Sequence, residues 1–151
     1  MKPILVALDD TAHPEAILRA AANLARTLHA PLVLYRSVSA PAFQVTPDGM
    51  PLTIDVDLEA ERRARRELEA YARTLPADVP ARVETAVDVP WQGVCEAARR
   101  EDASLIVIGS HVGHGPHPII DRLLGTTAAK VVNHADRAVL VVPDELTAWP
   151  S

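Results

Sequence analysis

The residues of this chain that could bind an anionic ligand follow two apolar runs. One of these runs, 105–108, breaks into a turn rich in glycine and histidine, and a helical pattern comes next. Glycines let a backbone approach a ligand closely, and free N–H groups at a turn and at a helix start can face a phosphate. The candidate residues are Asp9, which ends the first run, and Gly109, His111, Gly113, Gly115, Gly125, Thr126 and Thr127.

Each candidate also has a purely structural interpretation. Asp9 could cap the helix expected near Pro14, and the glycines could form a bare turn. We favour ligand binding for both, because ligands bind beyond the carboxyl ends of strands in parallel sheets. Thr126 and Thr127 lie in a helical pattern, where their hydroxyls could reach a phosphate or bond back to a helix carbonyl. The sequence leaves these two roles open.

Metal binding and catalysis find less support in the sequence. His111, His114 and His117 recur every third residue, and three imidazoles can hold zinc. Glycines and prolines interrupt this stretch, however, so the spacing defines no common helical face and we predict no metal site. Lys130 lies too far into its helix to act as a P-loop lysine, and the chain has no Gly-Lys-Ser/Thr motif. We therefore expect little or no catalysis.

Composition limits the class of protein. The chain has 151 residues, of which 48% are apolar and 3% aromatic, so one domain with an aliphatic core is expected. The net charge of -5 argues against nucleic acid and acidic membranes as partners. No stretch reaches the ~18 apolar residues of a membrane span, and Asp9 and Asp10 interrupt the only apolar run near the N-terminus. A cytoplasmic protein is expected, with Cys95 as a buried thiol.

Apolar runs alternate with amphipathic patterns along the chain. We predict strands at 3–8, 32–35, 82–87, 105–108 and 139–143, and helices at 14–29, 55–75, 91–101 and 119–134. This order predicts an α/β fold with a parallel sheet and helices on both faces. The second helix has an expected apolar seam at Leu58, Leu68, Tyr71, Ala72 and Leu75. We interpret its charged run, 61–67, as a solvated face with Glu and Arg paired at helical spacing.

Three segments together resemble the universal stress protein family. Residues 4–9 look like the opening strand and acidic residue of that family, and residues 105–111 look like its fourth strand and glycine turn. Gly125-Thr126 with 139–143 looks like its closing segment. The resemblance covers nearly the whole chain. It implies a single Rossmann-like three-layer domain over residues 1–151, with a five-stranded parallel sheet in the order 3-2-1-4-5.

The resemblance also implies a divided function. Some family members bind ATP through a glycine, two residues, a glycine, nine residues, a glycine and then Ser or Thr, whereas others bind no nucleotide. Here the nine residues 116–124 separate Gly115 from Gly125, and Thr126 follows. Either Val112 replaces the first glycine, or Gly109 is that glycine in a lengthened turn. We prefer the insertion, because Gly109 keeps its place at the strand end.

By this resemblance Asp9 would accept a hydrogen bond from a ribose hydroxyl or an adenine amino group. Ser37 and Ile108 complete the predicted nucleotide-binding set. The expected cofactor is ATP, with or without Mg²⁺, or none. Three functions stay open: a nucleotide-binding stress-response or regulatory module, a dimeric interaction protein without nucleotide, and a slow ATPase or other hydrolase. The expected partner is a second copy, forming a homodimer through the last strand, 138–142.

Overall fold

The computed structural model describes residues 1–9, 14–38, 47–50, 56–110 and 125–143. Strands and helices alternate through these residues, as the apolar pattern predicted. In chain order they are β1 (Ile4–Ala7), α1 (Glu15–Leu28), β2 (Leu32–Val38), α2 (Val56–Thr74), β3 (Ala81–Val87), α3 (Pro90–Arg100), β4 (Leu105–Gly109), α4 (Thr126–His134) and β5 (Ala138–Val142). No helix in this part of the chain is long and apolar enough to cross a bilayer.

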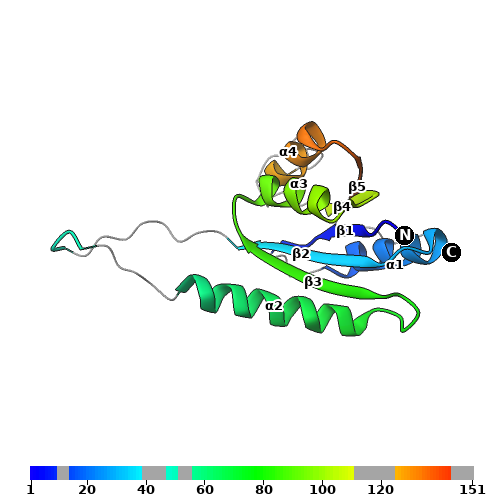
Figure 1. The fold of residues 1–151 in the computed structure, drawn as a ribbon, viewed down its shortest axis with the longest axis horizontal. Helices are drawn as coiled ribbons and strands as arrows, with labels where there is room; N and C mark the ends of the chain where they lie inside the picture. Colours follow the sequence, from blue (N-terminus) through cyan, green and yellow to red (C-terminus); the bar gives the residue numbers. More distant parts are fainter. Residues whose placement is uncertain (10–13, 39–46, 51–55, 111–124, 144–151) are drawn as a thin grey trace.

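The strands form one parallel sheet in the order β3-β2-β1-β4-β5, which confirms the predicted architecture. The chain proceeds from β1 outward to β3 and then returns to place β4 against the other side of β1. The strand order therefore reverses between β1 and β4, where Ala7 pairs with Ile108. In Figure 1 the carboxyl ends of β2 and β3 point to the left.

Helices cover both faces of the sheet. In Figure 1 α3 and α4 lie above the sheet and α2 lies below it. Leu32 and Leu34 of β2 belong to the core cluster that contains α1 and α2, whereas Val33 and Tyr35 belong to the cluster of α3 and α4. This alternation follows from the period of two along a strand. The central strand β1 is buried on both faces, and for that reason its sequence is a continuous apolar run.

The packing of α2 differs in part from the expected seam. Leu68 is fully buried and Ala64 is also buried, but Leu58 is 49% exposed. The arginines of the charged run are exposed, as expected of a solvated face. Two of its glutamates instead reach the sheet: Glu67 pairs with Arg36 of β2, and Glu61 accepts a hydrogen bond from Thr85 of β3. The helix thus contacts the sheet through polar groups as well as through its apolar seam.

The two leucines of α2 provide a matched test of this packing. Leu68→Ala should lower the free energy of unfolding by about 2–5 kcal/mol, because it removes a fully buried side chain and leaves a cavity. Leu58→Ala, the same substitution at an exposed site, should change it by no more than about 0.5 kcal/mol. Urea unfolding followed by circular dichroism measures both values. Equal costs at the two positions would contradict the observed placement of α2.

Candidate functional site

Two of the predicted site residues lie together where the strand order reverses. Asp9 follows β1 and is exposed, and Gly109 is the last residue of β4. The register that pairs Ala7 with Ile108 brings the ends of these two strands side by side. Ligands of doubly wound sheets bind in the crevice beyond such a reversal. Asp9 and Gly109 are therefore at the edge where binding chemistry is expected.

The start of α4 lies against the same edge. The N–H of Gly125 donates to the carbonyl of Ser110, which directly follows β4, at 2.9 Å. Gly125 is the N-cap of α4, with φ -56° and ψ 157°, and Thr126 and Thr127 are the first helical residues. The prediction that Gly125 lies inside a helix running from 119 to 134 was wrong for this residue. The apolar pattern in the sequence extends to residues before Gly125. The hydrogen bonds of α4, however, begin with the Ala129 N–H, which donates to the Gly125 carbonyl.

The position of Gly125 at the N-cap places the two threonines at the very start of α4. Thr126 and Thr127 occupy the first turn of α4, where backbone N–H groups have no carbonyl partner within the helix. The positive end of the helix dipole lies at the same place and favours an anion. Their hydroxyls are poorly placed to bond back to a helical carbonyl, because α4 has no residues before Thr126.

Asp9 does not cap α1. The N-cap of that helix is Pro14, which has no side-chain acceptor. The exposed carboxylate of Asp9 thus remains at the carboxyl edge of the sheet, and the structural interpretation considered for it does not hold.

Gly109 also has a packing role. A Cβ added to this residue would lie 2.8 Å from the Cδ1 atom of Ile17, which is buried in α1. The glycine therefore lets α1 approach the end of β4. Immediately after it, the N–H of Ser110 donates to the Val142 carbonyl at 2.9 Å and extends the pairing of β4 with β5.

The other two described candidates take different positions. Ile108 is 6% exposed and its side chain packs in the core between the sheet and α3 and α4, so only its backbone is suited to a ligand. Ser37 is half-buried, and its Oγ lies 3.4 Å from the Tyr35 hydroxyl and 3.5 Å from the Pro90 carbonyl. Ser37 therefore lies on the carboxyl edge of β2 but toward α3.

A buried tyrosine–carboxylate pair, which the sequence pattern did not predict, lies next to Ser37. The Tyr35 hydroxyl donates to Asp88 Oδ2 at 2.5 Å, and Asp88 Oδ1 is buried with no hydrogen-bond partner among the described residues. Burial, followed by the hydrogen bond to Asp88, raises the pKa of Tyr35 above its usual value. The carboxylate lies against Gly93 of α3, where a Cβ would overlap it. An acidic residue at a strand end just before Pro90 was the available signal.

Three predicted residues, His111, Gly113 and Gly115, lie outside the described residues, as do His114 and His117. Among the residues that the structure does describe, no group of three or more His, Cys, Asp or Glu side chains could hold a metal ion. Cys95 is buried, and burial raises the pKa of its thiol, as expected of a structural cysteine.

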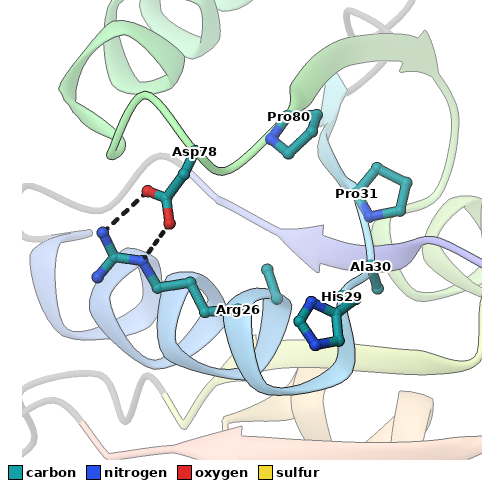
Figure 2. A pocket seen from close by; sticks show the side chains of 7 residues that line it. Arg26, His29, Ala30, Pro31, Asp78 and Pro80 are labelled. Atoms are coloured by element: carbon teal, nitrogen blue, oxygen red, sulfur yellow. Dashed lines mark hydrogen bonds and ion pairs between the residues drawn. The ribbon is translucent and has the colours of Figure 1, made fainter.

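A hollow of ≈ 500 Å³ lies at the amino ends of β2 and β3, on the side of the sheet opposite to Asp9 and Gly109. Figure 2 shows its lining residues, which include Pro31 and Pro80 just before β2 and β3. Arg26 donates to both carboxylate oxygens of Asp78 there, at 3.0 and 2.9 Å. The hydrogen bond to Arg26 holds the pKa of Asp78 below its usual value. These charges neutralise each other, and the hollow is remote from Asp9 and Gly109, so it is not part of the candidate site.

The order β3-β2-β1-β4-β5, with helices on both faces, defines a doubly wound α/β protein. The model of the universal stress protein family matches residues 1–143. The chain therefore belongs to the universal stress protein family.

Individual relatives agree with this assignment. Universal stress protein A homolog 1 of Coxiella burnetii is 29% identical over 143 residues, which are 93% of this chain and 95% of that protein. The universal stress protein of Archaeoglobus fulgidus in complex with dAMP has a TM-score of 0.62 and 23% identity, covering 94% of this chain and 98% of that one. A universal stress protein in complex with cAMP has a TM-score of 0.65 and 22% identity, covering 95% and 98%.

The fit of Asp88 against Gly93 can be tested by substitution. Gly93→Ala should lower the free energy of unfolding by about 1–3 kcal/mol, because the new Cβ would displace the carboxylate from Tyr35. The higher helix propensity of alanine, worth about 1 kcal/mol, opposes this loss only in part. Thermal unfolding followed by circular dichroism gives the values.

The control is the same substitution in an Asp88→Ala background. There the overlap is absent, so adding Gly93→Ala should be neutral or stabilising relative to Asp88→Ala alone. The same loss in both backgrounds would show that Gly93 is needed for another reason.

Proposed function

We propose that this protein is a nucleotide-binding member of its family that binds ATP, with or without Mg²⁺, at the carboxyl ends of β1 and β4. The observation that carries the proposal is the convergence of three elements there. Asp9 follows β1, Gly109 ends β4, and the hydrogen bond from Gly125 to Ser110 holds the start of α4 beside them. The dAMP and cAMP complexes of proteins with the same fold support an adenine nucleotide.

Each element has a role in this proposal. The first turn of α4, with Thr126 and Thr127, meets the phosphates through backbone N–H groups and hydroxyls. The glycine turn of Gly109, Gly113 and Gly115, together with His111, completes the phosphate contacts. Asp9 accepts a hydrogen bond from a ribose hydroxyl or from the adenine amino group. Ser37 and the backbone of Ile108 border the nucleotide on the remaining sides.

The same residues favour binding over rapid turnover. Lys130, the lysine of α4, lies 6.0 Å from the centre of the Trp91 ring, away from the start of its helix. We therefore propose a regulatory module that responds to nucleotide occupancy, with little or no catalysis.

Binding can be tested with the purified chain. ATP–Mg²⁺ should bind with a Kd on the order of micromolar and raise the melting temperature, because a ligand of the native state stabilises it by about 2.7 kcal/mol at 100 times Kd. Gly125→Val should abolish this shift while leaving the circular dichroism spectrum unchanged, since the backbone angles of Gly125 are open to any residue. Val132→Ala, at an exposed site of the same helix, is the control. No calorimetric heat at millimolar ATP–Mg²⁺ would refute the proposal.

We also propose a homodimer formed through β5. The two outer strands of the sheet, β3 and β5, differ in their side chains. On β3, Glu84 pairs with Arg100 and Arg82 pairs with Glu101, so charges protect that edge. On β5 every residue is apolar, and Val139, Leu140 and Val141 are only half-buried. Pairing with the same strand of a second copy would satisfy the outward backbone groups of β5, which pair with no other strand among the described residues, and would cover its side chains.

The register of β5 indicates a selective test. Because the Val142 carbonyl accepts from Ser110, the backbone N–H and carbonyl groups of Leu140 and Val142 point toward β4, and the N–H of Val141 points away from β4. Val141→Pro removes that N–H without removing a ladder bond to β4, so it should weaken the dimer at least ~10-fold while the sheet persists. Light scattering measures the mass and circular dichroism reports the fold. A monomer mass for the unsubstituted protein at micromolar concentration would rule the dimer out.

A further inference from the structure

Arg36 is a buried cation close to the proposed nucleotide site. Its side chain is 6% exposed and lies on the sheet face that carries α1 and α2. Its Nε donates to the carbonyl of Leu8 at 3.2 Å, and its Nη1 forms an ion pair with Glu67 of α2. A buried charge is costly unless it is paired and hydrogen-bonded, so this arginine is held by both contacts.

The contact with Leu8 replaces a bond of the sheet. The N–H of Leu8 donates to the Tyr35 carbonyl at 2.8 Å, which continues the parallel ladder between β1 and β2. In a regular parallel ladder the next bond would run from the N–H of Ser37 to the Leu8 carbonyl. Here the Arg36 side chain donates to that carbonyl. The two strands therefore part at Leu8, and a side chain takes over from the backbone.

This replacement fixes the orientation of Asp9. The peptide group that joins Leu8 to Asp9 is planar and trans, so its carbonyl and its N–H point in opposite directions. Since the Leu8 carbonyl points toward β2 and Arg36, the N–H of Asp9 points toward β4. The backbone of Asp9 thus leaves the sheet with its N–H toward the end of β4, beside Gly109.

We propose that Arg36 is a positioning residue for nucleotide binding: clamped by Glu67, it holds the Leu8 carbonyl and so orients Asp9 at the carboxyl ends of β1 and β4. The function assigned to Asp9 rests on the proposed nucleotide site, whereas the clamp itself does not. A second consequence is that α2 is linked to the site through Glu67, so a displacement of α2 changes the orientation of Asp9.

The clamp can be tested without any ligand. Arg36→Met keeps the length of the side chain and removes both contacts, so the amide of Asp9 should change its NMR chemical shift and exchange faster with solvent. Arg65→Met is the matched control, because Arg65 lies on α2, is exposed, and contacts Thr85 of β3 at 3.5 Å rather than β1. An Asp9 amide that behaves identically in both variants would overturn the proposal. If Arg36→Met does not fold, Glu67→Ala removes the clamp from the arginine and should give the same change.

A double-mutant cycle then tests the effect on binding. Isothermal titration with ATP–Mg²⁺, well below the melting temperatures, should show Arg36→Met weakening binding ~10-fold and Arg65→Met leaving it unchanged. Asp9→Asn should weaken binding in the wild-type background but add little to Arg36→Met, because the arginine acts through Asp9. Additive losses would overturn the positioning role. If the wild type binds no nucleotide, the proposed function fails, and the amide measurement alone decides whether the clamp exists.

Discussion

The pairing of β1 with two neighbours is the constraint on which the rest of this structure depends. Only four residues long, β1 is buried completely and hydrogen-bonds to β2 on one side and β4 on the other. A strand in that position must be apolar throughout, and the first residue that can be polar is the one that leaves the sheet. That residue is Asp9, and β4 ends beside it with Gly109. The location of the candidate site is therefore a consequence of how the central strand is buried.

The sheet ends at this edge in two different ways on its two faces. On the face of α1 and α2, Arg36 pairs with Glu67 and donates to the Leu8 carbonyl just after β1. On the same face, Thr85 donates to Glu61. On the face of α3, the polar groups are Tyr35, Ser37 and Asp88, and Gly93 makes room for the carboxylate. Both sets of polar side chains lie near the carboxyl ends of β2 and β3, where the backbone pairing of the sheet ends. Polar side chains there satisfy backbone and hydroxyl groups that the ladder no longer reaches, and they hold the strand ends in place.

Much of this architecture could be predicted from the sequence, because burial requires apolar residues at a spacing that can be seen within a single element. The continuous apolar run of β1 and the helical spacing in α1 each specify their element within a residue or two. The Arg36–Glu67 pair could not be predicted in this way, because 31 residues separate its members and a charged run on a helix is normally solvated. The Tyr35–Asp88 pair spans 53 residues and was missed for the same reason. Gly125 was misplaced because apolar periodicity does not reveal where helical hydrogen bonds begin.

The charges near the proposed site suggest why it would bind nucleotide without consuming it rapidly. Among the described residues, Arg36 is committed to Glu67 and to the Leu8 carbonyl, and Lys130 lies over Trp91. The phosphates would then be met mainly by backbone N–H groups of the turn and of the first turn of α4, in a chain whose net charge is -5. Fixed dipoles of this kind bind the ground state of a phosphate well. Acceleration requires groups that bind the transition state more tightly than the ground state, and such groups are usually cations aimed at the charge that develops on the transferring phosphoryl group. Occupancy, which the proposed Arg36 clamp would transmit to α2, would therefore be the property of this site best suited to regulation.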